Sequence, residues 1–89
     1  MITAVVLITA ERSALPKLGE DLAALPGVSE VYSVTGEFDF IAMVRAKTHD
    51  ELADIVTTRI AQTKGVGKTH THVAFRAYSK HDLETLFAP

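Results

Sequence analysis

The sequence predicts an α+β domain with the element order βαββαβ, for three reasons. Two amphipathic helical patterns alternate with short segments rich in β-branched residues. The two halves of the chain are similar at a shift of about 38 residues, and the matched pairs include Leu18 with Val56, Leu22 with Ile60 and Gly27 with Gly65. The composition of the 89 residues, 47% hydrophobic and 22% charged, suits one globular domain. We therefore expect residues 1–89 to form a single ferredoxin-like domain, with both helices on one face of a four-stranded antiparallel sheet.

The first half of the chain predicts a strand, a helix and a second strand. Residues 2–9 are short and β-branched, which favours a strand. A leucine stripe at helical spacing follows: Leu15, Leu18, Leu22 and Leu25. Ser13 is the predicted N-cap of this helix and Pro26-Gly27 its predicted stop. Residues 28–35 predict the second strand.

The second half repeats the pattern after a tight turn at Gly36. Residues 38–46 predict the third strand. A capping box from Thr48 to Glu51 then starts the second helix. Its predicted buried stripe is Leu52, Ile55, Val56 and Ile60, and Gly65 is its predicted C-cap. The fourth strand is expected within residues 66–78, before a short helix at about residues 80–87.

The third and fourth strands are predicted to carry apolar residues on both faces, although the helices can cover only one. One predicted face carries Phe38, Phe40, Ala42 and Val44, and the opposite face carries Ile41 and Met43. A chain this short has a marginal core of its own, and its lack of cysteine excludes disulfides. We therefore expect a second copy to cover the bare face, because contiguous apolar patches rarely stay exposed.

Charge and composition exclude several classes of function. Nine Lys and Arg against eleven Asp and Glu give a formal net charge of −2, with no basic cluster, which argues against direct nucleic-acid binding. The apolar residues 2–10 lack the cationic start of a signal peptide and are too short for a membrane helix. We expect a cytoplasmic protein with no nucleic-acid or membrane partner.

Two segments carry a resemblance to a known family. Residues 34–40 (VTGEFDF) are similar to its Gly-x-aromatic-Asp turn, and residues 65–71 (GVGKTHT) to its Gly-Val-x-x-Thr-x-Thr segment. From Ile2 to about Leu86, the chain resembles the effector-binding domain of Lrp/AsnC-type transcriptional regulators, called the RAM domain (regulation of amino acid metabolism). Full-length members also have an N-terminal helix-turn-helix domain. Because the first strand is predicted from residue 2, the resemblance is to a stand-alone RAM domain.

The resemblance implies a non-enzymatic module that binds a small molecule, with an amino acid as the expected effector, and serves the transcriptional regulation of amino-acid metabolism. It implies barrel-like dimers whose sheets face each other and that assemble into rings or larger discs. The pocket would lie between subunits, near the Gly36 turn and the Thr-x-Thr strand. The implied partners are the effector, further copies of the chain and a full-length regulator. No cofactor or metal is implied.

The chemistry of an amino acid suits the residues of these two segments. Glu37 and Asp39 offer acceptors for an α-ammonium group, whereas Thr69, Thr71 and the backbone around Gly36 offer donors for an α-carboxylate. Each residue also has a structural interpretation. Glycine is needed at a tight turn, an Asp can cap a turn or pair with a cation, Glu37 can be simply solvated, and Thr is an ordinary strand residue, here on one face with Val73 and Phe75.

His70 and His72 alternate on one strand face, a spacing that can present two imidazoles to a metal. A protein metal site normally needs a third ligand, which the sequence does not place nearby, so solvated or interface histidines are the preferred interpretation. Such histidines can also make assembly sensitive to pH. The alternative function is a small dimeric ferredoxin-like barrel enzyme, monooxygenase- or isomerase-like, with His70 or His72 as its base. A purely structural oligomerisation domain is a third alternative.

Overall fold

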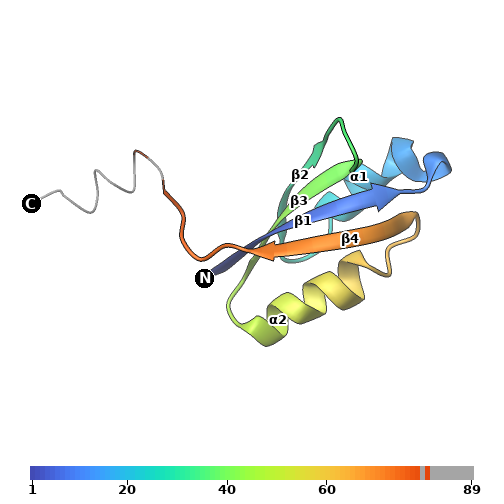
Figure 1. Ribbon diagram of the computed structural model, residues 1–89. Coiled ribbons are helices and arrows are strands. Elements are labelled where there is room, and N and C mark those ends of the chain that lie inside the picture. The colour runs from blue at the N-terminus through green and yellow to red at the C-terminus, as the bar shows by residue number, and fades with distance from the viewer. Residues whose placement is uncertain (79, 81–89) are drawn as a thin grey trace, which may run out of the picture.

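The computed structural model describes residues 1–78 and 80 and has the predicted element order (Figure 1). The strands are β1 (Ile2–Ala10), β2 (Val28–Ser33), β3 (Phe40–Ala46) and β4 (Val66–Val73). The helices are α1 (Leu15–Ala23), which follows a 3₁₀ turn, η1 (Arg12–Ala14), and α2 (His49–Asp54), which continues as a π-helical segment, η2 (Ile55–Ile60). The predicted helix at about 80–87 lies outside the described residues except for residue 80. No described helix is long and apolar enough to span a membrane.

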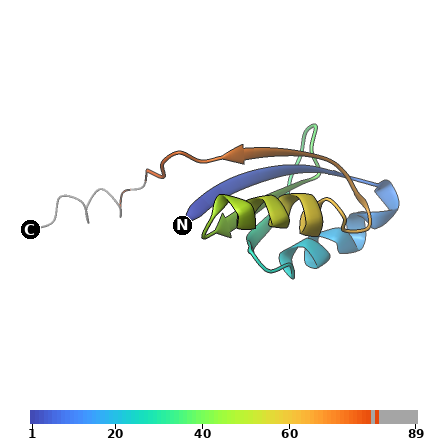
Figure 2. The same ribbon diagram turned by 90° about the horizontal axis from the view of Figure 1, so that it is seen from below.

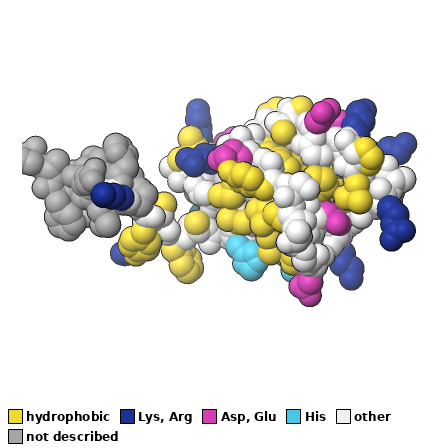
Figure 3. All heavy atoms as spheres, turned by 90° about the horizontal axis from the view of Figure 1, so that it is seen from above, with side chains coloured by type: hydrophobic (Ala, Val, Ile, Leu, Met, Phe, Trp, Pro, Cys, Tyr) yellow, Lys and Arg dark blue, Asp and Glu magenta, His cyan; other side chains and the backbone are white. Residues whose placement is uncertain are grey.

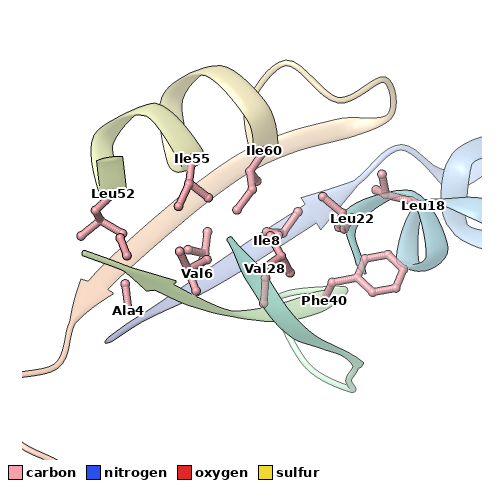
Figure 4. Packing of buried hydrophobic residues seen from close by; sticks show 13 residues of the cluster. Ala4, Val6, Ile8, Leu18, Leu22, Val28, Phe40, Leu52, Ile55 and Ile60 are labelled. Carbon is pink, nitrogen blue, oxygen red and sulfur yellow. The ribbon is translucent and has the colours of Figure 1, made fainter. Parts of the chain in front are cut away.

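The four strands form one antiparallel sheet in the order β2-β3-β1-β4, which confirms the predicted ferredoxin-like fold. Both helices lie on the same side of this sheet (Figure 2). We call the opposite side the open face, because no described helix covers it. The core lies between the sheet and the helices, where Leu52, Ile55 and Ile60 point down onto β1 and β3 (Figure 4).

The two central strands show the internal repeat most directly. The shift of about 38 residues matches Ala4 with Ala42 and Val6 with Val44. In the sheet, Ala4 of β1 pairs with Val44 of β3 and Val6 pairs with Ala42, so the matched residues occupy reciprocal positions. All four side chains are completely buried on the helix side. Small residues at these positions let both helices approach the middle of the sheet closely. The pairing of β1 with β3 therefore sets the position of every other element.

The second helix contains one more residue than the repeat requires. The shift of about 38 residues matches Leu18 with Val56, but the structure buries Ile55 completely and leaves Val56 half-buried. The π-helical segment absorbs the extra residue, as the hydrogen bond from Ala61 N to Val56 O at 3.0 Å shows. Ile55 and Ile60, five residues apart, can therefore both face the core.

The glycine after each helix packs against the helix of the other half. Gly27 has a φ of +93°, and a Cβ there would lie 2.3 Å from Cδ1 of Ile55. Gly65 has a φ of +98°, and a Cβ there would lie 2.3 Å from Cβ of Ala14. Both sites require glycine for backbone conformation and for space. Gly27 and Gly65, which were predicted only to end the helices, therefore also pack the two halves of the domain together.

The two helices begin differently. At α2, Thr48 Oγ1 accepts a hydrogen bond from Glu51 N at 3.1 Å, as predicted, although the Glu51 carboxylate accepts from Lys47 N rather than from the N-cap. At α1, the prediction of Ser13 as N-cap is wrong, because Ala14 occupies that position. The bond from Ala14 N to Glu11 O closes the 3₁₀ turn and places Ser13 inside it.

Alanine at Gly27 should destabilise the domain more than alanine at Gly36. Gly36 also has a positive φ, +107°, but a Cβ there would meet nothing within 4 Å. Gly36→Ala should therefore lower the free energy of unfolding by about 1 kcal/mol through backbone strain alone. Gly27→Ala adds the overlap with Ile55, so we expect a loss of about 3 kcal/mol. Urea unfolding of both variants measures the difference, and equal losses would contradict the packing role of Gly27.

Candidate functional site

The five residues predicted to bind an effector lie toward one end of the sheet. Gly36 and Glu37 lie in the exposed turn between β2 and β3, and Asp39 immediately precedes β3. Thr69 and Thr71 lie on β4, at the opposite edge of the sheet from β2. The strand between these two groups is β1, whose C-terminal end at Ile8–Ala10 separates them.

Asp39 joins the β2–β3 turn to the end of β1. Its carboxylate Oδ2 accepts a hydrogen bond from Ala10 N at 2.7 Å, and its own N–H donates to Ile8 O at 2.9 Å. Its carbonyl oxygen accepts from Val34 N at 3.1 Å. The side chain is half-buried. Because a carboxylate has about four acceptor positions, the bond to Ala10 leaves capacity for a ligand donor.

The two threonines point to the helix side of the sheet. Thr69 pairs with Ile8 and Thr71 with Val6, whose side chains are both in the core. Because β4 is an edge strand, Thr69 is only half-buried and Thr71 is exposed. The prediction that Phe75 shares this strand face is wrong, because β4 ends at Val73.

A single chain therefore assembles these residues only in part. Asp39 and Thr69 flank Ile8 from opposite sides, which places their backbones about two strand spacings, roughly 10 Å, apart. Thr71 lies two residues further into the sheet, and Gly36 faces open space. The residues share one end of the sheet, but Asp39 and Thr69 lie on opposite sides of β1.

The depressions found in the described part of the chain lie elsewhere, around α1. The first, which we call the α1/β2 groove, has a volume of about 460 Å³ and is lined by Leu15, Pro16, Gly19, Glu20, Val31, Ser33 and Phe40. The second, of about 310 Å³, is lined by Glu11, Ser13, Ala14, Lys17, Leu18, Asp21, Lys64 and Gly65. Neither contains a residue of the predicted site. The sequence signal that could have indicated the α1/β2 groove is Leu15. It belongs to the predicted leucine stripe but is 41% exposed at the groove instead of buried in the core.

The open face has an apolar centre and two polar rims. Its centre consists of Val5, Leu7, Ile41 and Met43, all half-buried. The strand register places Glu30 and Tyr32 of β2 along one rim and His70 and His72 of β4 along the other. The prediction of apolar residues on both faces is confirmed for β3. It is wrong for β4, whose residues on the open face, His70 and His72, are polar, and β1 supplies the other apolar residues of this face.

The histidines lie on this face rather than in a groove. His70 lies beside Leu7 and His72 beside Val5, and both side chains are exposed. The ring of Phe38 meets the ring of His70 edge-on, with 5.2 Å between the ring centroids. Phe38 therefore does not share a face with Phe40 as predicted, because β3 begins only at Phe40. Among the described residues, no cluster of three or more His, Cys, Asp or Glu side chains could hold a metal.

The Tyr32 phenol hydrogen-bonds to the Glu30 carboxylate on the β2 rim, and this bond raises the pKa of Tyr32 above its usual value. The negative charge of Glu30 acts in the same direction, because it disfavours the phenolate.

Glu30→Gln should therefore lower the pKa of Tyr32 toward that of a free tyrosine. Absorbance titration at alkaline pH measures this, with Tyr78→Phe used in both proteins to isolate Tyr32. An unchanged titration curve would show that the pair does not form.

Comparison with known proteins identifies relatives over most of the chain. The family model described as the Lrp/AsnC ligand binding domain matches residues 3–83. An uncharacterized HTH-type transcriptional regulator from Pyrococcus furiosus is 42% identical over 59 residues, which are 66% of this chain and 39% of that relative. The chain thus spans about two fifths of the length of this relative.

Solved structures share the fold of this chain. The protein TTHA0845 from Thermus thermophilus is 51% identical, with a TM-score of 0.83 over 90% of this chain and 100% of that one. The transcriptional regulator NMB0573 from Neisseria meningitidis, in complex with L-Met, has a TM-score of 0.79 over 88% of this chain and 52% of that one. At 14% identity, this second likeness shows a shared fold alone.

One relative is an enzyme. A homocitrate synthase from Sulfurisphaera tokodaii is 36% identical over 55 residues, but these make up only 12% of the enzyme. A match to so small a part says nothing about where the activity of that enzyme is located.

Proposed function

The chain belongs to the Lrp/AsnC ligand-binding domain family, and on that premise we propose that it binds an amino acid at a site completed by a second copy. Family membership makes it a regulatory effector-binding module, and its relatives are named as transcriptional regulators. The identity of the effector class and the assembly are our proposal. One observation carries it: the predicted ligand residues gather at one end of the sheet, but neither groove described above contains any of them.

The open face is the surface on which a second copy would pack. Its four half-buried apolar side chains lie on neighbouring strands, with polar residues on both sides. An apolar centre inside a polar rim is the usual anatomy of a protein interface. Two sheets packed in this way would form the barrel-like dimer that the family resemblance implies.

An amino-acid effector suits the groups at the end of the sheet. Asp39 is held rigidly by its backbone contacts and still offers acceptor positions for an α-ammonium group. The turn at Gly36 exposes backbone groups, and the Thr69 hydroxyl can donate to an α-carboxylate. The L-Met complex of the Neisseria regulator supports this ligand class on the same fold.

Binding across an interface would couple the effector to assembly. A ligand held by two copies favours the assembly that buries it, and by linkage assembly raises the affinity for the ligand. The changed assembly would then present a different surface to a full-length regulator in the cytoplasm. The enzymatic alternative would place His70 and His72 inside the dimer, because both lie on the open face. The family match and the relatives named as transcriptional regulators favour the regulatory function over this alternative.

Asp39 variants separate a ligand role from a structural one. Asp39→Asn keeps an oxygen that can accept from Ala10 N, so stability should fall by less than about 1 kcal/mol. The loss of charge should weaken amino-acid binding about tenfold or more, because a hydrogen bond to a charged group contributes about 1.5–3 kcal/mol. Asp39→Ala should lower both the stability of the domain and its affinity for the amino acid. Thermal-shift titration with each of the twenty amino acids measures binding, and an Asn variant that is stabilised as strongly as the wild type would contradict the proposal.

Met43→Glu tests the open face. Met43 lies at the centre of this face, opposite Val5, and a two-fold interface would bury two copies of the new charge. We expect the native mass to fall below that of the wild type, because the two-fold contact is lost, while the circular dichroism spectrum stays folded. Thr58→Glu, at an exposed position of η2 on the helix side of the sheet, is the matched control and should keep the wild-type mass. A wild-type chain that is already monomeric at micromolar concentration would refute the interface.

A further inference from the structure

The segment after β4 carries two aromatic side chains that contact little of their own domain. We call residues 74–78 the arm. The last ladder bond joins Ala74 N to Thr3 O at 2.9 Å, and beyond it the arm runs away from the sheet (Figure 1). Phe75 is 100% exposed and Tyr78 is 77% exposed. Full exposure of a phenylalanine on an extended segment forfeits a large burial energy, which indicates a surface meant for contact.

The domain also has an apolar hollow that no described residue fills. The floor of the α1/β2 groove is the buried ring of Phe40, and Leu15 and Val31 lie on its walls. Glu20 places an exposed carboxylate at its edge. In the space-filling view, hydrophobic side chains gather at the centre of the domain surface, and others stand on the segment that leads away from it (Figure 3).

Phe75 of the arm cannot reach the groove of its own chain. Ser33, which lines the groove, belongs to the edge strand β2 and pairs at the end of the sheet where β3 begins. Val73 ends the other edge strand, β4, at the opposite end of the sheet. Ser33 and Val73 therefore lie at diagonal corners, roughly 20 Å apart from strand spacing and residue rise. Phe75 follows Val73 by two residues, which span at most about 7 Å.

We propose that the arm of one copy docks in the α1/β2 groove of a neighbouring copy. Phe75 supplies the apolar anchor for the hollow lined by Leu15 and Phe40, and Arg76 pairs with Glu20 at its edge. Apolar burial provides the affinity, and the ion pair provides orientation.

This contact differs in kind from a sheet-to-sheet dimer. The arm and the groove are different surfaces, so the interface is heterologous and links copies head to tail. Heterologous contacts close into rings when the rotation permits and otherwise extend. Together with a two-fold contact on the open face, such a link would carry assembly beyond a dimer. The proposal does not depend on amino-acid binding.

Cross-linking can test the contact cleanly because the chain has no cysteine of its own. One population carries Tyr78→Cys and a mass tag, and a second, untagged population carries Ser33→Cys in the groove. After mixing and treatment with a short bis-maleimide, we expect a tagged–untagged conjugate. Ser29→Cys, exposed on the same strand but away from the groove, is the matched control and should give little product.

A third acceptor, His70→Cys, reports docking on the open face instead. Equal yields at Ser29 and Ser33, a higher yield at His70, or no conjugate at Ser33 would each overturn the proposal. A charge exchange provides an independent readout. Arg76→Glu in the tagged chain should lower the Ser33 yield about two- to fivefold, as expected for an exposed ion pair, and Glu20→Arg in the acceptor chain should restore it.

Discussion

The antiparallel pairing of β1 with β3 is the contact on which the rest of the domain depends. It brings Ala4 and Val6 against Val44 and Ala42, and these small buried side chains form the surface on which both helices pack. The helices then lock to each other through Gly27 and Gly65, each fitted against the helix of the other half. Because both helices pack on this single surface, no helix among the described residues covers the opposite face of the sheet.

That asymmetry connects the fold to its regulatory role. A domain that satisfies its core on one side and leaves Leu7, Ile41 and Met43 half-buried on the other gains from association. In the proposed assembly, the ends of the sheet, where turns and strand termini leave backbone groups free, would form the edges of the interface. A ligand placed there would be sensed through assembly, which needs no moving part within the chain.

Much of the architecture was predictable, because it depends on periodicity and local chemistry. The leucine stripe, the Thr48 cap and the two post-helix glycines all act within a few residues, and the internal repeat then dictates the topology. The start of β3 was predicted two residues too early, because contacts with a distant part of the chain decide where this strand begins. Because Asp39 bonds to the end of β1, β3 begins only at Phe40, and the ring of Phe38 contacts His70 instead of sharing a face with Phe40. Residues 38–40 carry no local pattern that would predict these contacts.

The sequence by itself determined the family, the order of elements and which residues of the central strands face the helices, since these follow from motif and alternation. Only the tertiary structure decided how the predicted ligand residues are arranged in space relative to one another. It interposes β1 between Asp39 and Thr69, directs the aromatic residues after β4 away from the core and opens a groove beside α1. These relations depend on strand order and register, which join residues some thirty positions apart and leave no periodic trace in the chain.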